Sequence, residues 1–484
     1  MKKITTLCAT LVLAAMVGNV YAQRAWAYDL KVTQDSTSYT FTFKSVSNDV
    51  TEANLVFTDT ASVLVGKVQV ENVVAGANTI TLAEEQIPGE DVTMTWAVEL
   101  TAPAITSMTE ITDAERGIYN FYLPQDVAVD NNPESDNFGK IYIAEGTDGA
   151  SDGGTERTQA QKRGVFTYDP LLNELNTTNV GYVPANVTLT DATRQAIHRI
   201  AVRPTDGVVA FAYNVDPTAI WTVPATGDAV NLINGITDIT LANPLCFDEK
   251  GVLYVMNNAN TTDGGTIYKV EGTTATKIIQ STVWSNQDNS MASDGRGGLW
   301  VAQHRWAIDD YNILTHINAA GEIDYAVNKT ADAAILALFD ATNNASYRGQ
   351  LAYNTKENVI AFGGNKVVTL FNVTYDATTG VPTLTKGLQT PTLGTNIDGL
   401  AFDYAGDLLV LSASAERFYK YALPTTDNHI IVPAQKAQTI VKIQETSLEN
   451  TKVKAQKATK IIRNGQVYIL RGNTMYNMLG QEVK

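Results

Sequence analysis

The chain has 484 residues, of which 44% are hydrophobic and 18% are charged, an ordinary composition for a folded globular protein. This composition excludes wholesale disorder and a protein with many membrane spans. Residues 431–484 carry 9 basic and 3 acidic residues, whereas residues 23–430 carry 24 basic and 48 acidic residues, a net charge of −24. Because such an acidic body repels phosphate backbones and anionic lipids, we expect no nucleic-acid partner.

Residues 1–22 have the pattern of a secretory signal peptide. Lys2 and Lys3 precede the apolar run Leu7–Val17, and Val20-Tyr21-Ala22 follows with small residues where a signal peptidase cleaves. We therefore expect cleavage after Ala22 and export from the cytoplasm. No stretch reaches the roughly 18 apolar residues that a spanning helix requires, so we expect no insertion into a membrane.

Residues 23–102 predict a small antiparallel β-sandwich. Short runs of alternating apolar and polar residues are separated there by Asn, Asp, Gly and Pro. The runs are YDLKVTQ, YTFTFKS, EANLVFTD, GKVQVENV, NTITLAE and VTMTWAVEL. Their number and the length of the region resemble immunoglobulin-like modules, so we expect an Ig-like β-sandwich.

Residues 103–430 repeat one unit, an apolar strand ending at a polar residue, a tight turn and a second apolar strand. Internal repeats of this size are the signature of propellers and solenoids. The aligned turn residues are Asp130, Arg203, Asp248, Asp294, Asn354 and Asp403. A third strand follows most copies, so the pattern predicts six four-stranded blades arranged radially, each burying the faces of its neighbours. The fold class is therefore all-β.

Two of the repeats carry a family resemblance. The segments IDGLAFDYAGDLLVLSAS (397–414) and NPLCFDEKGVLYVMNN (243–258) resemble blades of NHL and gluconolactonase-like six-bladed β-propellers. The resemblance implies the fold and leaves the chemistry open, because one propeller fold carries many activities.

The C-terminal residues divide into a polar linker, 431–460, and a tail, 461–484. The linker is rich in Lys, Gln and Thr and reads as solvated chain. In the tail, Asn464-Gly465 between apolar runs predicts a β-hairpin, and Gly472-Asn473 supplies a second turn. Its GQVYI…YNMLGQEV pattern resembles the type IX sorting tails of secreted Bacteroidetes proteins. That resemblance implies a secretion machinery as partner and delivery to the cell surface or medium. The alternative is a last hairpin docked on the propeller, which leaves the protein in the periplasm.

Polar residues recur where the first strand of each predicted blade begins. In a propeller this strand lies nearest the axis, so its first residues line the mouth of the central channel. The residues at this position are Gln125, His198, Asn243, Asn289, Gly349 and Asp398, and the second strands return to the same mouth at Glu145, Asn214, Asn257, Gln303 or His304, and Ser412. Neighbouring Asp126, Arg199, Arg348 and Gln350 join this ring or point between blades. Either the mouth is polar because it is hydrated, or it binds a ligand.

The resemblance to gluconolactonase-like enzymes implies one kind of ligand for this mouth, a divalent metal held by a Glu, two Asn and an Asp. Glu145, Asn214 or Asn257, and Asp398 match these residue types, and oxygen ligands suit Ca²⁺ or Mg²⁺. The chain departs from that family because it lacks the usual N-terminal glutamate signature. A second cluster of oxygens, in DNNPESDNFG (130–139), lacks EF-hand spacing and reads instead as a hydrogen-bonded turn.

Aromatic residues give the other indication of a ligand. Trp306 and Tyr311 flank HRWAIDDY in a predicted loop at the channel mouth, where their rings could stack on a glycan. Trp96, Trp221 and Trp300 lie inside strand patterns, so we expect them in cores. Cys246, which alone of the two cysteines lies outside the leader, is expected to be a buried thiol and not a nucleophile.

These features favour an exported binding protein that recognises a glycan or a surface protein through the loop face of the propeller. No Gly-x-Ser-x-Gly elbow or catalytic triad pattern is present, so an enzyme is the less favoured interpretation. The predicted binding residues are Trp306, Tyr311, His198, Asn243, Asn289, Gln303, His304 and Arg348. The alternative is a metal-dependent lactonase or hydrolase at the channel mouth, with Asp398, Glu145, Asn214 and Asn257 as ligands. A purely structural surface protein is the third possibility.

Overall fold

The computed structural model describes residues 23–35, 37–89, 92–113, 115–149, 163–176, 180–189, 197–213, 218–258, 265–280, 290–303, 312–328, 339, 349–364, 366–394, 396–442, 458–463, 466–471, 474–477 and 481–483. In these residues the regular structure is almost entirely β-strand, as the sequence predicts. The exceptions are two single-turn 3-10 helices, η1 (Glu84–Gln86) and η2 (Gly117–Tyr119).

The described residues contain no helix that is both long and apolar enough to cross a membrane.

Two sheets face each other in a β-sandwich, which confirms the predicted strands of the N-terminal region. One sheet has the order β1 (Ala27–Gln34), β2 (Ser38–Ser45), β5 (Gly76–Ala83), and the other has the order β29 (His429–Pro433), β6 (Val92–Thr101), β3 (Glu52–Asp59), β4 (Leu64–Val70), with β30 (Ile440–Lys442) also paired to β6. Side chains of β2 alternate between half-buried and buried. Phe41 lies 5.8 Å from Phe57 and 4.9 Å from Trp96, ring centre to ring centre, so these aromatic rings fill the space between the sheets.

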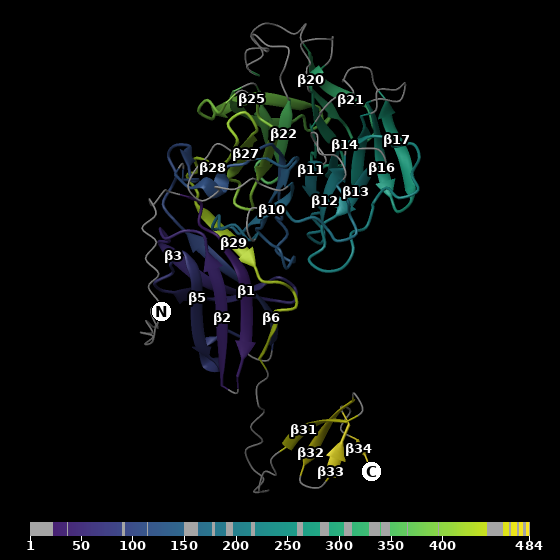
Figure 1. Cartoon of the computed structure of the whole chain (residues 1–484). Helices are drawn as coiled ribbons and strands as arrows, with labels where there is room; N and C mark the ends of the chain where they lie inside the picture. The colour runs from purple at the N-terminus through teal and green to yellow at the C-terminus, as the bar shows by residue number, and fades with distance from the viewer. Residues whose placement is uncertain are drawn as a thin grey trace. The chain divides into compact units, whose positions relative to one another are not determined.

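One strand of the sandwich comes from the far side of the repeat region. β29 pairs with β6 in antiparallel register, His429 opposite Thr101 and Pro433 opposite Ala97 (Figure 1). The repeat region is therefore inserted between two neighbouring strands of the sandwich. The prediction of a linker over 431–460 was wrong for residues 431–433 and 440–442, which form strands against β6. Residues 443–457 lie outside the described residues.

The described residues of the repeat region form six antiparallel sheets, which we number in chain order as propeller sheets 1 to 6. Sheet 1 contains β8 (Pro124–Val129), β9 (Ile141–Glu145) and β10 (Gly164–Tyr168), and sheet 2 contains β11 (Ile197–Val202), β12 (Val209–Tyr213) and β13 (Ala219–Thr222). Sheet 3 contains β14 (Ala242–Phe247), β15 (Leu253–Asn257), β16 (Thr266–Glu271) and β17 (Thr274–Gln280), and sheet 4 contains β18 (Ser290–Ser293), β19 (Leu299–Ala302), β20 (Asn312–Ile317) and β21 (Ile323–Asn328). Sheet 5 contains β22 (Gln350–Asn354), β23 (Val359–Gly363), β24 (Val368–Tyr375) and β25 (Pro382–Gln389). Sheet 6 contains β26 (Gly399–Phe402), β27 (Leu408–Ser412), β28 (Arg417–Ala422) and β7 (Thr109–Glu110).

The first strands of these sheets close a ring. β8 packs on β11, β11 on β14, β14 on β18, β18 on β22, β22 on β26, and β26 returns to β8. Apolar side chains of neighbouring sheets share clusters, for example Trp300, Phe362 and Phe371 between sheets 4 and 5. Such a radial array of antiparallel sheets is the architecture of a β-propeller. β7 precedes sheet 1 in the chain yet completes sheet 6, so the two ends of the repeat region are joined within one sheet.

The turn between the first two strands of a propeller sheet is held by the side chain of the Asp or Asn residue at which it begins. At Asp130, Asp248, Asp294, Asn354 and Asp403, the Oδ1 atom accepts a hydrogen bond from the amide two residues later. In three of them Oδ1 also accepts from the amide four residues later. These Asx-type bonds explain why the sequence repeats Asp or Asn at this position.

The C-terminal residues form a separate unit with its own four-stranded sheet. Its strands are β31 (Ala458–Arg463), β32 (Gln466–Arg471), β33 (Thr474–Tyr476) and β34 (Glu482–Val483), in that order. Arg463 pairs with Gln466 and Arg471 pairs with Thr474, so two-residue connections stand at both predicted turns. The predicted hairpin is confirmed, but the sheet begins three residues earlier than predicted and contains four strands.

Candidate functional site

The two ends of the propeller differ in their connections. We call the end where the first strands begin the loop end, and the opposite end the turn end. Strand pairs are joined at the turn end by short connections, such as 203–208, 294–298 and 403–407. Two long segments both start and finish at the loop end, since β9 ends at residue 145 and β10 begins at 164, and β21 ends at 328 and β22 begins at 350. Variable connections of this kind carry binding sites in many folds.

The predicted binding residues that the structure describes are buried. His198 and Asn243 are 0% exposed and Gln303 is 1% exposed. The amide atoms of Asn243 have no hydrogen-bond partner in the protein. These three side chains are therefore enclosed by the protein and do not form an open surface. Five predicted residues lie outside the described residues, Asn289, His304, Trp306, Tyr311 and Arg348.

Two of the predicted metal ligands, Glu145 and Asn257, hydrogen-bond to the backbone just before the first strand of their own sheet. Oε1 of Glu145 accepts a hydrogen bond from the amide of Leu123 at 2.9 Å, just before β8. Oδ1 of Asn257 accepts from the amide of Leu241 at 3.1 Å, just before β14, and its Nδ2 donates to the carbonyl of Asp238 at 3.1 Å. The end of the second strand is thus fastened to the start of the first by the same kind of bond in sheets 1 and 3.

The other candidate ligand, Asp398, is engaged with the backbone as well. Its Oδ2 accepts a hydrogen bond from the amide of Ala413 at 2.6 Å, and the residue is 0% exposed. Asn214 lies outside the described residues. Within the described ranges, no three or more His, Cys, Asp or Glu side chains come together as a metal site. The carboxylates at this end of the ring are thus already used as backbone acceptors.

Arg199 is the centre of a polar hub at the axis. Its Nη1 donates to the carbonyls of Gln125 at 2.9 Å and Asp398 at 3.2 Å. The side-chain amide of Gln350 is oriented so that its oxygen accepts a hydrogen bond from Arg199 Nη2 at 2.9 Å. The Nε2 of Gln350 then donates to the carbonyl of Asp398 at 3.2 Å. The guanidinium of Arg199 in sheet 2 therefore links sheets 1, 5 and 6. The sequence pattern marked these residues only as polar positions near the channel mouth and did not predict the hydrogen bonds between them.

Asp126 lies beside this hub and is half-buried. Its carboxylate accepts hydrogen bonds from the amides of Ile200 at 3.1 Å and Val127 at 2.9 Å. Burial raises the pKa of Asp126 to about 7, and the nearby Arg199 opposes that rise. The hub therefore holds one carboxyl group that changes charge near neutral pH.

The second predicted oxygen cluster, residues 130–139, is a docked turn. The carbonyl of Glu134 and Oδ1 of Asp136 accept hydrogen bonds from Nε2 of Gln435, and Oε2 of Glu134 accepts from the amide of Lys436 at 2.9 Å. These bonds connect sheet 1 with the segment between β29 and β30. They support the interpretation of this segment as a hydrogen-bonded turn.

The residues expected in cores are mostly buried. Trp96 is 1% exposed and Trp300 is 0% exposed, whereas Trp221 is half-buried and packs at the edge of a cluster between sheets 1 and 2. Cys246 is a free thiol that is 7% exposed, and burial raises its pKa. A raised pKa keeps the thiol protonated, which fits a structural cysteine.

The sandwich meets the propeller at the turn end. Arg24, from the segment before β1, forms an ion pair with Glu357 in the turn of sheet 5 and donates to the carbonyl of Ala405 in the turn of sheet 6. Trp26 contacts Phe138 of sheet 1 and Tyr404 of sheet 6. The sequence pattern did not single out Arg24 or Trp26, because an isolated pair next to the leader has no periodicity to mark it.

Comparisons with known proteins give similarities of structure and not of sequence. No protein-family model and no curated protein sequence matches the chain. A gluconolactonase from Xanthomonas campestris has 12% identity and a TM-score of 0.41, covering 68% of this chain and 90% of its own. An auxiliary nutrient binding protein from Bacteroides ovatus has 10% identity and a TM-score of 0.42, covering 81% and 97%. A protein of unknown function from Bacteroides thetaiotaomicron has 12% identity and a TM-score of 0.41, covering 82% and 100%. At these values no ligand or activity of those proteins follows for this chain.

Proposed function

We propose that the chain is an exported binding protein that captures a glycan or a surface protein at the loop end of a six-bladed β-propeller. In this proposal an Ig-like sandwich holds the propeller by its turn end. The observation that carries the proposal is the position of the sandwich, since Arg24, Trp26 and Gln435 all contact turn-end connections. In this proposal the partner binds at the loop end, where the segments between β9 and β10 and between β21 and β22 start and finish.

In this proposal the predicted aromatic residues Trp306 and Tyr311, which lie outside the described residues, act at this end. In the sequence they come between Ala302, where β19 ends, and Asn312, where β20 begins. The apolar faces of such rings stack on sugar rings, while polar neighbours bond the hydroxyl groups. A glycan is therefore the ligand class that we test first.

A glycan array probed with the full mature chain tests the proposal, followed by titration of the best glycan against Trp306→Ala. We expect Trp306→Ala to weaken binding about 5- to 150-fold, because a stacked ring contributes on the order of 1–3 kcal/mol. Tyr468→Ala, in the separate C-terminal sheet, is the control and leaves the affinity unchanged. Equal affinity of Trp306→Ala and the parent chain removes the assignment.

Metal-dependent hydrolysis at the channel mouth is the competing proposal. It needs Glu145, Asn257 and Asp398 to turn oxygens toward an ion that now accept backbone hydrogen bonds. Thermal unfolding with EDTA and then with Ca²⁺ or Mg²⁺ separates the two, because an ion bound to the folded state raises the melting temperature. We expect no shift. A shift of several degrees that Asp398→Asn removes would favour the hydrolase and call for a lactone screen.

Export and sorting are a further part of the proposal. The predicted leader precedes Gln23, and the C-terminal sheet carries the sorting-type sequence. Truncation after Lys442 removes that sheet and leaves the sandwich strands in place. We expect the truncated protein to be folded but held in the periplasm of its native host, whereas the full chain reaches the surface or the medium. Equal secretion of both would show that the tail is not a sorting signal.

A further inference from the structure

Sheet 6 holds a buried lysine, Lys420, on its third strand, β28. Nζ of Lys420 lies 2.8 Å from Oδ2 of Asp403, the turn residue that follows the first strand, β26. Both side chains are only 2% exposed. A primary amine is thus held against a carboxyl group in a place from which water is excluded, where an ion pair is costly to bury.

The same position of sheet 4 is occupied by a histidine. Lys420 lies opposite Leu409 in the strand ladder as His316 lies opposite Trp300. Nε2 of His316 is 3.1 Å from Oδ2 of its own turn residue, Asp294. An amine can form a stable amide with a carboxyl group, whereas an imidazole cannot, so sheet 6 differs from sheet 4 by a nucleophile at this position.

The carboxyl group of Asp403 is fixed in one orientation by the backbone of the turn. Its Oδ1 accepts hydrogen bonds from the amides of Ala405 at 3.0 Å and Asp407 at 2.9 Å. When an amine adds to the carboxyl carbon, negative charge collects on an oxygen, and two amide donors already point at Oδ1. Oδ2, which faces Lys420, is then the oxygen that can leave.

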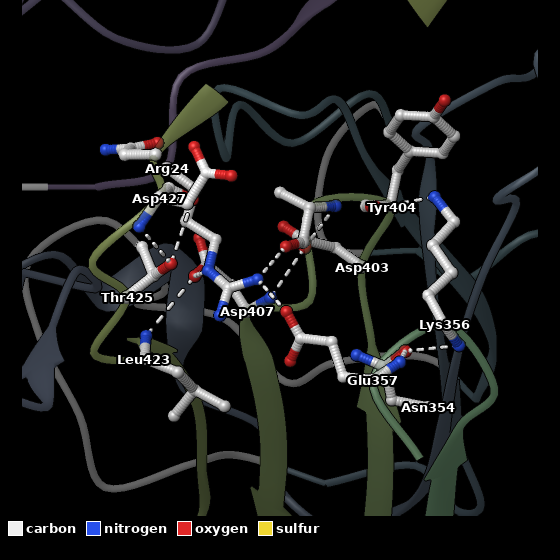
Figure 2. A network of polar contacts seen from close by, with 12 residues as sticks. Arg24, Asn354, Lys356, Glu357, Asp403, Tyr404, Asp407, Leu423, Thr425 and Asp427 are labelled. Atoms are coloured by element: carbon white, nitrogen blue, oxygen red, sulfur yellow. Dashed lines mark hydrogen bonds and ion pairs between the residues drawn. The ribbon is translucent and has the colours of Figure 1, made fainter. Parts of the chain in front are cut away.

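Asp407 places a second carboxyl group beside this pair. Its side chain is 1% exposed and shares a network with Asp403, Arg24 and Glu357 (Figure 2). Burial raises the pKa of Asp407 to about 7, Asp403 adds to the rise, and Lys420 and Arg24 oppose it. A carboxyl group of this kind can both take up and release a proton at neutral pH.

A second lysine near Asp403 is placed differently. Nζ of Lys356 donates to the carbonyl of Tyr404 at 3.0 Å and lies 3.4 Å from the centre of the Tyr404 ring. Its amine is therefore occupied by the backbone and the aromatic ring. Lys356 provides a matched control for any role assigned to the amine of Lys420.

We propose that Lys420 and Asp403 form an isopeptide bond, a covalent strut between the first and third strands of sheet 6. Nζ of Lys420 attacks Cγ of Asp403, so that the Nζ–Cγ bond forms and the Cγ–Oδ2 bond breaks. The ammonium group gives up two protons, which leave with Oδ2 as one water. Asp407 carries these protons and ends as it began, so no further reactant is consumed.

The fold favours this reaction, although it makes the reaction slow. Contact between the two groups corresponds to an effective concentration of about 10⁵ M or more. Burial acts to lower the pKa of Lys420, but Asp403 and Asp407 outweigh it and raise that pKa, so only a small fraction of the amine is neutral. Each molecule needs to react only once, and the amide product removes two charges from the interior.

The bond fastens the sheet that closes the ring. Sheet 6 joins β7, from the start of the repeat region, to β26, β27 and β28 from its end. Cys246 is the one cysteine that follows the predicted leader, so the mature chain has no disulfide of its own to do this. An isopeptide bond supplies a cross-link that does not depend on cysteine.

Tryptic digestion of the full mature chain after unfolding, followed by mass spectrometry, tests the proposal. Trypsin cuts this region after Lys386, Arg417, Lys420 and Lys436. A chain without the bond therefore gives the separate peptides 387–417, 418–420 and 421–436.

The bond blocks the cut after Lys420 and joins peptide 387–417 to peptide 418–436. We expect this branched product, with the mass of one water lost from the sum of the two peptides. If protein kept folded at neutral pH for several days yields only the separate peptides, the proposal is overturned without any variant being made.

Three variants assign the roles of the residues. Lys420→Arg keeps the positive charge but removes the amine, and we expect no branched product. Lys356→Arg is the matched control, in which the product forms as in the parent chain. Asp407→Asn cannot carry protons, so we expect the product to form at least tenfold more slowly. Formation at the parent rate in Asp407→Asn would refute the role of Asp407.

The parent chain held in urea shows whether the bond depends on the fold. We expect no branched product there, because unfolding separates the amine from the carboxyl group. A branched product that forms equally in urea, or that persists in Lys420→Arg, would show that it does not arise from this buried pair.

Discussion

His316 shows how a single buried side chain joins two neighbouring propeller sheets. Its Nδ1 lies 2.6 Å from Oδ1 of Asp324, and its Nε2 lies 3.1 Å from Oδ2 of the turn residue Asp294. Its ring lies 4.5 Å from Trp300 and 5.9 Å from Tyr375 of sheet 5. The turn of sheet 4 is thereby tied both to its own third strand and to the next sheet.

We expect Asp294→Asn to destabilise the fold by about 3 kcal/mol at pH 7, as loss of one partner from a buried polar pair does. Burial acts to raise the pKa of Asp294, but bonds from His316 and two backbone amides outweigh it and hold the pKa below its usual value. Its stabilising contribution is therefore complete above about pH 4 and is lost as the pH falls further. Urea unfolding at pH 7 and pH 3 measures both effects.

Asp206→Asn is the control for this measurement. Asp206 forms an ion pair with Arg203 at 2.7 Å, but its side chain is 47% exposed, so its loss is expected to cost less than about 1 kcal/mol. A loss in Asp294→Asn no larger than this, or one that persists unchanged at pH 3, would contradict the assigned role of Asp294.

At the scale of elements, sequence patterns predicted the strands and turns that neighbouring residues specify. They missed the pairing of strands that lie far apart in the sequence. The alternating runs predict β1 to β6, and the repeated turns, five at Asp or Asn and one at Arg203, predict the paired strands of the propeller sheets. β29 was missed because it pairs with β6, more than 300 residues earlier, and no local pattern records that pairing. Strand-end residues of the candidate site were recognised as polar, but their bonding to backbone amides depends on the closed ring.

β29 itself offers a test with neighbouring residues. Val432 is 0% exposed and Ile431 is 44% exposed, since successive side chains of a strand face opposite sides. We expect Val432→Asp to cost at least 3 kcal/mol by burying an unpaired charge, and Ile431→Asp to cost less than about 0.5 kcal/mol. Urea unfolding of both variants measures the difference. Similar small effects would mean that these residues do not belong to the sandwich.

At the scale of the whole molecule, the propeller is inserted between strands β6 and β29 of the sandwich, so the sandwich stabilises the two ends of the propeller segment. Besides β6 and β29, Ile105 bridges Thr425, and Nδ2 of Asn428 donates to the carbonyl of Pro103 at 2.9 Å. These contacts pin together the two segments through which the chain enters and leaves the ring. Trp26 packs at the same junction, between Phe138 of sheet 1 and Tyr404 of sheet 6.

We expect residues 23–442 to unfold in one cooperative transition, because the sandwich and the propeller share these segments and the contacts of Arg24 and Trp26. Residues 103–430 alone lack Arg24 and Trp26, so Phe138 and Tyr404 lose the ring that packs on them. We expect that fragment to melt at a clearly lower temperature or to aggregate. Differential scanning calorimetry of both chains makes the comparison, and two separate transitions in the longer chain, or equal melting temperatures, would contradict it.

The pairing of β29 with β6 also decides how the protein carries mechanical load. A pull between β1 and a C-terminal anchor enters and leaves through the sandwich. The hydrogen bonds from His429–Thr101 to Pro433–Ala97 transmit the tension across two adjacent strands before it reaches the inserted ring. The propeller therefore lies outside the path along which that force is transmitted. A molecule tethered by its tail can be stretched in flow while its propeller remains unstrained.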